Sequence, residues 1–190
     1  MSQQSMRPIR ETIPLEEARA LMRDAARPIT RVETVPLEAA HRRVLASAIV
    51  AGQDVPPFTR AAMDGYAVVA EDTFGAGQFQ PRPLRLVEKV HTGEVPARPV
   101  TRGGCTEIAT GAPMPDGADA VVMVEETEKD ESGEVRVFSP VYPGQNVGRR
   151  GADIQAGQAI LASGDYLTSS RVGVIAALGI DRVEVFERPR

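Results

Sequence analysis

The sequence predicts an α+β protein in which a β-rich inserted domain interrupts a discontinuous outer domain. Two patterns indicate this class: helical periodicity at both ends of the chain, and short apolar runs separated by Gly and Pro in the middle. The 17 Gly and 15 Pro of 190 residues favour many turns and short strands. We therefore expect the discontinuous outer domain at residues 1–52 and 143–190, and the inserted domain at residues 53–142.

The first helix is predicted to begin near Leu15, with Thr12 as its cap and Pro14 in the first turn, and to end before Pro28. Its apolar positions recur with helical spacing and form one face, made of Leu15, Ala18, Leu21, Met22 and Ala25. We expect part of this face to remain exposed, or to be covered by a neighbouring chain.

A second helix is predicted over residues 37–46, because Leu37, Ala40 and Val44 follow helical spacing after Pro36. The remaining elements are expected at residues 48–50 (extended), 66–69, 84–90, 106–109, 120–125 and 135–138 (strands, the last two joined by a hairpin link at 129–133), about 169–178 (helix) and 182–186 (strand). Thr168 or Ser169 is expected to cap the late helix, and Gly179 to end it.

Composition excludes several classes of function. A net charge of −4, 4% aromatic residues and no Trp do not suit a nucleic-acid-binding surface, so we expect no nucleic-acid partner. No apolar run approaches the roughly 20 residues of a membrane span, so we expect no membrane contact and a cytoplasmic protein. The single cysteine, Cys105, has no partner for an internal disulfide, and the common P-loop, zinc and serine-hydrolase motifs are missing.

Three loops contain more special residues than turns require. The first presents Asp64 just before a predicted strand, and the second places Thr110 just after another. The third carries Arg149 and Arg150 between glycines and ends with Asp153. Carboxylates, a hydroxyl and guanidinium groups together suit an anionic ligand that carries magnesium. For each residue the alternative is a structural one: a turn that bonds its own backbone, or a solvated ion pair.

The three loops, in this order, closely resemble the molybdopterin molybdotransferase family, which also includes the E domain of gephyrin. The resemblance is carried by Asp-Val-Pro-Pro-Phe at 54–58 with Ala-Met-Asp-Gly-Tyr-Ala-Val at 62–68, Thr-Gly-Ala-Pro at 110–113 with Gly-Ala-Asp-Ala-Val-Val at 117–122, and Gly-Gln-Asn-Val at 144–147 with Arg-Arg-Gly at 149–151 and Asp-Ile at 153–154. It spans about residues 15–189. The stretch resembles the N-terminal half of the family. This resemblance implies that residues 1–52 and 143–190 form a discontinuous, elongated α/β linker and dimerisation domain, interrupted by a barrel-like domain at residues 53–142.

The resemblance implies a transferase of molybdenum cofactor biosynthesis. In that family the substrates are molybdate and adenylylated molybdopterin, the cofactor is Mg²⁺, and AMP is released. The active cleft lies between the pterin-binding domain of one subunit and the N-terminal domains of its homodimer mate. By motif position, Asp64, Thr110 and Asp153 would be catalytic, with Asp64 and Asp153 as metal ligands and Arg149 and Arg150 as substrate-binding residues. Because the pterin-binding domain is absent from this sequence, we expect the isolated chain to be inactive.

The sequence also departs from the family pattern. Gly148 stands where a third arginine is common, Ala152 where a polar residue is usual, and Ala61 where Ser is frequent. The anion-binding loop is therefore one cation short, unless another residue supplies that charge. Two alternatives to the transferase stay open: a non-catalytic dimerisation module that binds an oxyanion or a partner, and a plain structural module in which all three loops are turns.

Overall fold

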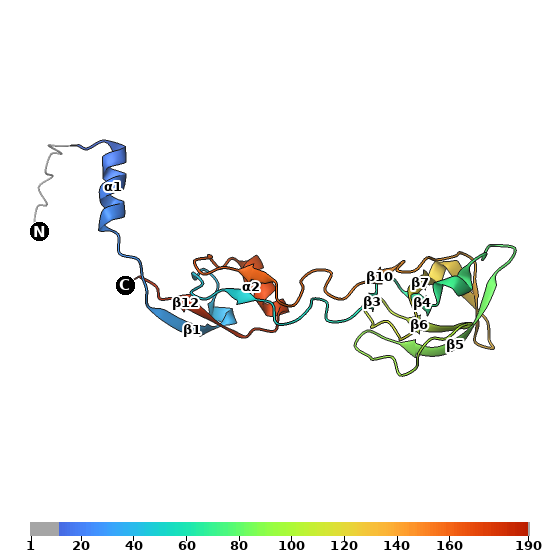
Figure 1. Cartoon of the computed structure of the whole chain (residues 1–190). Coiled ribbons are helices and arrows are strands. Elements are labelled where there is room, and N and C mark those ends of the chain that lie inside the picture. The colour runs from blue at the N-terminus through green and yellow to red at the C-terminus, as the bar shows by residue number, and fades with distance from the viewer. Residues whose placement is uncertain (1–11, 190) are drawn as a thin grey trace, which may run out of the picture.

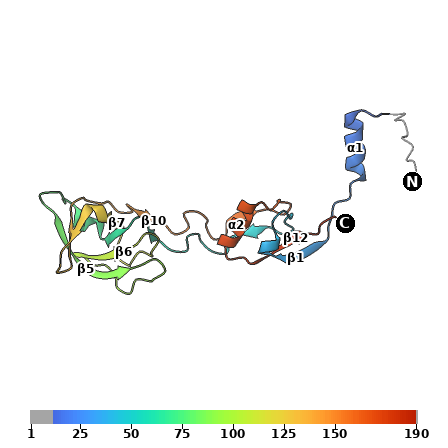
Figure 2. The same cartoon turned by 180° about the vertical axis from the view of Figure 1, so that it is seen from behind.

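The computed structural model describes residues 12–189, and Figure 1 shows an elongated molecule. Helix α1 (Leu15–Ala25) lies at one end. Next to it along the molecule comes a small lobe that contains α2 (Ser169–Ala177), and the largest sheet lies at the far end. Figure 2, the view from behind, shows the same order, with two chain segments running between the lobe and the sheet.

The small lobe is built from two segments that are distant in the sequence. Strand β1 (Val32–Pro36) pairs antiparallel with β12 (Arg182–Phe186), and β2 (Ile49–Val50) pairs antiparallel with β11 (Ala159–Leu161). Helix α2 and the short 3-10 helix η1 (Leu37–Ala39) pack beside them. The buried apolar core of this lobe consists of Val35, Ala40, Leu45, Ile49, Ala51, Leu167, Ile175, Leu178, Val183 and Val185.

The prediction of a helix over residues 37–46 is wrong beyond the first turn. After η1 the backbone of Arg42 takes a φ of 63°, which a right-handed helix does not contain. The next residues instead join strands: Val44 bridges to Tyr166, and Leu45 bridges to Val185 and is fully buried. Burial of Leu45 against distant strands thus outweighs the local helical spacing.

The first and last helices agree with the sequence more closely. Helix α1 begins at Leu15, but its N-cap is Pro14 and no side chain caps it, so the expected Thr12 cap is wrong. None of its residues is buried, which leaves the predicted apolar face exposed. In α2 the cap at Thr168 is confirmed, because its side chain accepts a hydrogen bond from the Arg171 N–H. Gly179 follows with a φ of 75°, the left-handed stop that was expected.

The main sheet has six strands in the order β7-β4-β6-β5-β9-β8, all antiparallel except the β5–β6 pair. The strands are β4 (Gly65–Val68), β5 (Arg82–Val90), β6 (Gly104–Ile108), β7 (Ala120–Met123), β8 (Thr127–Lys129) and β9 (Glu134–Val137). Five of them were expected. The sixth, β8, follows the 3-10 helix η3 (Val124–Glu126), so the hairpin link before β9 joins it to β8 and not to β7.

The sheet curls into a half-barrel. Lys129 on the edge strand β8 reaches across to Glu107 on β6, with 2.8 Å between Nζ and Oε2. In the sheet order two strands, β5 and β9, lie between β6 and β8. Inside the curl lies a core that includes Tyr66, Cys105 and Val122, and a second cluster contains Ala67, Ile108 and Val121. The α+β class is confirmed, with strands predominating.

Two short strands lie where the paired chain segments meet the half-barrel. They are β3 (Arg60–Ala61) and β10 (Val147–Gly148), which pair antiparallel with Ala61 opposite Val147 and Arg60 opposite Gly148. A last 3-10 helix, η2 (Ala70–Thr73), follows β4. The separate apolar cores are compatible with two domains, while the boundaries at 52/53 and 142/143 stay a prediction.

Candidate functional site

Asp64 and Thr110 meet because their strands are neighbours. Asp64 directly precedes β4, Thr110 follows β6 by two residues, and the antiparallel register sets Gly65 opposite Ile108. The Thr110 N–H and hydroxyl both donate to Oδ1 of Asp64, at 2.6 and 2.7 Å. The hydrogen bond from the Thr110 N–H has the larger effect and the one from the Thr110 hydroxyl the smaller, and together they hold the pKa of Asp64 below its usual value. Two of the predicted site residues thus form one exposed polar pair.

The pair leaves a defined hydrogen-bonding capacity for a ligand. Both bonds end on Oδ1, so within residues 12–189 Oδ2 of Asp64 accepts none. Because the Thr110 hydroxyl donates its only proton to Asp64, it faces other groups as an acceptor. An ionised carboxylate oxygen beside a hydroxyl acceptor suits a hydrated cation or a bound water.

The third loop reaches this region through β3 and β10. Ala62 N–H donates to the carbonyl of Asn146 at 2.9 Å, next to the Ala61–Val147 pair. The second loop joins on the other side of the same short strand, where Gly111 N–H donates to the Ala61 carbonyl at 2.9 Å and Ala61 N–H donates to Ala112 at 3.0 Å. Backbone pairing therefore brings all three predicted loops to one junction, which we call the three-loop junction (residues 59–64, 110–114 and 146–150).

Arg149 and Arg150 have different surroundings. Arg150 Nε lies 2.5 Å from Oδ2 of Asp54, and Oδ1 of Asp54 also accepts the Ala156 N–H at 2.9 Å. These bonds, the backbone one first, lower the pKa of Asp54. Arg149 is exposed and makes no ion pair within the described part of the chain. Of the two predicted substrate-binding cations, Arg149 is the one with an uncommitted guanidinium group.

Arg60 is a cation at the junction that the sequence analysis missed. It lies opposite Gly148 in the β3–β10 pair, and a Cβ on Gly148 would stand 3.3 Å from Cγ and 3.5 Å from Nε of Arg60. The side chain of Arg60 therefore occupies the space that Gly148 leaves. It is exposed, and no ion pair involves it in residues 12–189. The third cation that the loop lacks in sequence is thus present in space, and only the strand register reveals it.

Asp153 lies apart from the Asp64–Thr110 pair. Its N–H donates to the carbonyl of Val55 at 2.9 Å, beside the bridge between Val55 and Ile154. That bridge is at the opposite end of the paired segments from the Ala61–Val147 pair. The Asp153 side chain is exposed, without a hydrogen bond to any described residue. Within one chain the structure does not bring the two predicted metal ligands into contact.

No group of three or more His, Cys, Asp or Glu side chains in residues 12–189 is arranged to hold a metal ion. Mg²⁺ does not require such a group, because it is commonly held by one or two carboxylates together with substrate phosphates and water. The free Oδ2 of Asp64 fits that kind of partial ligation. His41 and Cys105 do not take part: His41 contacts Ser169, and Cys105 is buried, which raises its pKa to about 12.

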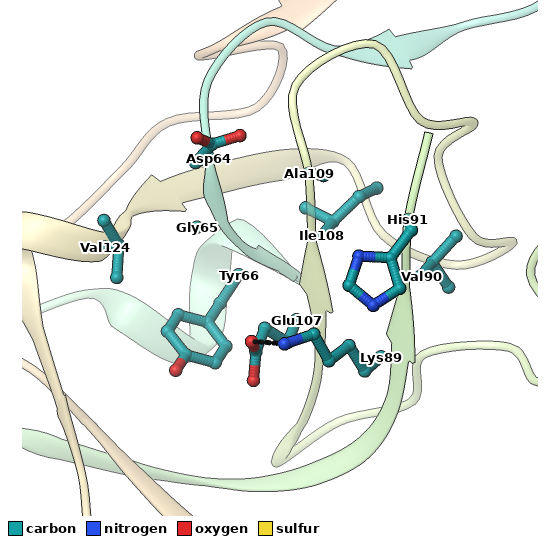
Figure 3. A pocket seen from close by; sticks show the side chains of 10 residues that line it. All are labelled: Asp64, Gly65, Tyr66, Lys89, Val90, His91, Glu107, Ile108, Ala109 and Val124. Carbon is teal, nitrogen blue, oxygen red and sulfur yellow. Dashed lines mark ion pairs between the residues drawn. The ribbon is translucent and has the colours of Figure 1, made fainter. Parts of the chain in front are cut away.

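A hollow of about 200 Å³ opens beside Asp64, between β4, β5 and β6 (Figure 3). Its lining residues are Asp64, Gly65, Tyr66, Lys89, Val90, His91, Glu107, Ile108, Ala109 and Val124. Lys89 forms an ion pair with Glu107 at 2.8 Å inside this lining. Lys89 and Glu107 could not be identified as site residues from the sequence, because they belong to strands and come together only through the sheet register.

The fold and the site define a class: an α+β protein with a curled half-barrel and an exposed polar junction built from three turn motifs. The family model "MoeA N-terminal region (domain I and II)" matches residues 13–179, and the chain belongs to this family. The resemblance inferred from the motifs is therefore confirmed.

The relatives are longer proteins. The chain is 40% identical over 174 residues to molybdopterin molybdenumtransferase 2 of Mycobacterium tuberculosis (strain H37Rv), a match that covers 90% of this chain and 41% of the relative. It is 36% identical over 158 residues to the molybdopterin molybdenumtransferase of Nostoc sp. (strain PCC 7120), covering 83% and 36%. A crystal structure of the molybdopterin biosynthesis moeA protein of Pyrococcus horikoshii OT3 superposes with a TM-score of 0.88 at 41% identity, over 94% of this chain and 47% of that one. The chain thus spans less than half the length of each of these relatives.

The described residues contain no helix with both the length and the apolar character needed to cross a bilayer.

Proposed function

We propose that this chain forms the N-terminal wall of the active site of a molybdopterin molybdotransferase in molybdenum cofactor biosynthesis. The observation that carries the proposal is the three-loop junction, where the Asp64–Thr110 pair and the uncommitted cations come together in a chain of the MoeA N-terminal family. The relatives are named molybdopterin molybdenumtransferases, which favours this reading over a non-catalytic binding module.

The proposed reaction inserts molybdate into adenylylated molybdopterin and releases AMP with the help of Mg²⁺. Such a reaction needs groups that bind a metal, order water and neutralise a leaving phosphate. When bound, Mg²⁺ would reduce charge repulsion around the adenylyl phosphate. The second half that the relatives carry would hold the pterin, and a homodimer mate would complete the cleft. An isolated N-terminal wall would then lack activity, because it cannot position the substrate.

Each residue of the wall has a role that its contacts support. Asp64 would hold a hydrated Mg²⁺ through Oδ2, and Thr110 would accept a hydrogen bond from a metal-bound water. Asp153, which lies at the other end of the paired segments, would contact metal or water at its own place on the wall. Arg149 would bind the phosphate of the leaving AMP, and Arg150, tied to Asp54, would fix the loop from which Arg149 projects.

We add Arg60 to the anion-binding residues. It has no ion-pair partner in the described residues. It lies opposite Gly148, the residue that immediately precedes Arg149 in the third loop. Two uncommitted guanidinium groups at one junction can each form a forked contact with a phosphate. Replacing Arg60 should therefore weaken AMP binding about as much as replacing Arg149.

The test is molybdate-dependent release of AMP from adenylylated molybdopterin, measured in the protein that includes the second half. Asp64→Asn and Thr110→Val should each lower turnover by about 10²-fold or more, the size expected when a group that stabilises developing charge is removed. Arg171→Gln, at a half-buried ion pair with Asp165 in the small lobe and away from the three-loop junction, is the matched control. Near-normal turnover of the folded Asp64→Asn protein would refute the proposal. Dimerisation without any gain of activity when the second half is added in trans would favour the binding-module alternative.

A further inference from the structure

We propose that the hollow beside Asp64 has, at its lysine side, a binding subsite for a small tetrahedral oxyanion. Lys89 and Tyr66, which line the hollow, and Lys129, which binds the lining residue Glu107, form this subsite. The chemistry of the ligand follows from the hydrogen-bond donors of these side chains. Only the choice of molybdate and phosphate as probes rests on the proposed function.

The first observation is the placement of the lysines. The chain has 22 basic residues, and only two of them, Lys89 and Lys129, are lysine. They lie 40 positions apart, on β5 and on the edge strand β8, yet both bind the same carboxylate: Lys89 Nζ lies 2.8 Å from Oε1 of Glu107, and Lys129 Nζ lies 2.8 Å from Oε2. In a chain that otherwise uses arginine, both compact ammonium groups converge on one place.

The ion pairs leave this group of side chains with spare donors and a positive charge. Each ammonium group has three N–H donors, of which one is used on Glu107, so four remain. Burial raises the pKa of Glu107, but the hydrogen bonds from Lys129 and Lys89 outweigh this effect and keep the carboxyl ionised. Two ammonium groups and one carboxylate sum to a charge of +1. The side chains of Lys89 and Lys129 are 53% and 40% exposed, so a ligand can reach both.

Tyr66 supplies the second, independent observation. The residue is only 4% exposed, but its hydroxyl has no hydrogen-bond partner in the described residues and lines the hollow. The hydroxyl oxygen itself is not buried, so it can donate a hydrogen bond to an anion in the hollow. Burial, and to a smaller extent the charge of Glu107, raise the pKa of Tyr66. Its O–H therefore remains available as a donor at neutral pH.

The sheet register assembles these groups in one row. Tyr66 on β4 is opposite Glu107 on β6, and Glu107 is opposite Lys89 on β5. Figure 3 shows Tyr66, Glu107 and Lys89 along one side of the hollow and Asp64 at the other. An anion held at the lysine side is therefore kept away from the Asp64 carboxylate. A volume of about 200 Å³ is below the roughly 300–1,000 Å³ of pockets for drug-sized molecules and suits a small hydrated anion.

The two lysines also provide a direct measurement. Selective ¹³C labelling of lysine gives two side-chain Cε signals from this chain, one for each member of the subsite. Sodium molybdate and inorganic phosphate are titrated separately at about pH 8, above the second pKa of inorganic phosphate, so that phosphate is mainly a dianion. Sodium chloride at equal ionic strength is the screening control. We expect saturable shifts of both signals with molybdate or phosphate, with a Kd of about 1 mM.

Variants separate this subsite from a general charge effect. Lys89→Gln should weaken oxyanion binding about tenfold, as observed through the remaining Lys129 signal, because one charged hydrogen bond is lost while Glu107 keeps a partner. Tyr66→Phe removes only the unpaired hydroxyl, so the fold should persist while binding weakens severalfold. Arg136→Gln removes a cation from the same sheet at an exposed pair with Glu128 and should leave binding unchanged.

Each outcome has a clear meaning. Tighter binding of molybdate would assign the subsite to the metal oxyanion, and tighter binding of phosphate would assign it to a phosphoryl group; both support the proposal. The proposal is overturned by shifts that do not saturate at about ten times the expected Kd, by equal shifts in sodium chloride, or by unchanged binding in Lys89→Gln. The transferase proposal would survive that failure, because it is tested separately by AMP release.

Discussion

Thr106 allows a stabilising substitution to be predicted from the structure. It lies in β6, is fully buried, and its Oγ1 has no hydrogen-bond partner in the described residues. A buried hydroxyl without a partner costs about 1–3 kcal/mol by protein mutational data. Valine has the same shape and suits a strand, so Thr106→Val should raise the free energy of unfolding by about 1–2 kcal/mol.

Thr73 provides the matched comparison, because the same substitution should have the opposite effect there. Thr73 is also fully buried, but its hydroxyl donates to the Ala70 carbonyl at 2.7 Å and accepts the Val141 N–H at 3.0 Å. Thr73→Val removes both bonds and leaves the Val141 N–H buried without a partner. We expect a loss of about 2–3 kcal/mol.

Urea unfolding followed by circular dichroism compares the two variants. Thr73 and Thr106 both contact the half-barrel, so they report on the same cooperative transition even if the small lobe unfolds separately. For a domain of this size each kcal/mol corresponds to about 2–8 °C in Tm. Thr106→Val should raise the urea concentration at the unfolding midpoint, and Thr73→Val should lower it. Destabilisation by both variants would show that the Thr106 hydroxyl is not an unsatisfied group.

Three further predictions test the site and the packing. The bonds from Thr110 hold the pKa of Asp64 in the folded chain below that of an unfolded aspartate, which is about 3.9. They therefore stabilise the fold above that value and are lost as the pH falls through the lower folded pKa. The Thr110 amide NMR shift should titrate with that lower midpoint, and a midpoint at or above the unfolded value would contradict the geometry. Burial raises the pKa of Cys105 to about 12, so a thiol reagent at about pH 8 should react only after unfolding in urea, and fast reaction of the folded chain would argue against burial. Gly65→Ala should lower the free energy of unfolding in urea by more than about 3 kcal/mol, because the new Cβ would stand 1.9 Å from a carbonyl oxygen of β7. Gly173→Ala in α2, where the Cβ would meet open space, should instead raise it by about 0.5–1 kcal/mol. Similar effects of the two substitutions would refute this account.

Elements with strong local signals could be predicted from the sequence. Helix α2 has its cap at Thr168 and its stop at Gly179, where the φ of 75° suits a residue without a Cβ. Strands β5 and β7 contain apolar residues that are buried in the sheet, so their composition is typical of strands. In these segments local propensity and tertiary packing favour the same structure.

The missed elements depend on distant partners. Strand β8 is Thr-Glu-Lys and has no apolar alternation; it is a strand because it pairs with β9 at the edge of the sheet. Strand β1 was assigned no structure in the sequence analysis, although it pairs over five residues with β12, about 150 positions away. Pairing of this kind is set by the fold as a whole, and a local window does not contain the information.

The same reasoning applies to the candidate site. Asp64 and Thr110 could be identified because turns beside strands carry unusual residues, and the structure joins them directly. Arg60 and Lys89 could not, because each acquires its significance from a residue across a strand pair: Gly148 for Arg60, and Glu107 for Lys89. Residue type suggests chemistry at a turn, whereas register decides which strand residues share a surface.

The motifs that carried the family resemblance contain two kinds of residue, which the structure separates by their contacts. Asp119 accepts the Ala70 N–H at 2.7 Å, so it holds the backbone of the half-barrel. Asn146, with a φ of 56°, donates to the Val121 carbonyl at 2.9 Å and so ties the third loop to β7. Arg149 and Asp153 are exposed, and no side-chain bond to residues 12–189 engages them. Since a side chain already bound within the fold must break a contact before it can bind a ligand, the residues left free are the better candidates for substrate contact. Substitution of Asp119 or Asn146 should therefore reduce stability and activity together, whereas substitution of Arg149 or Asp153 should reduce activity alone.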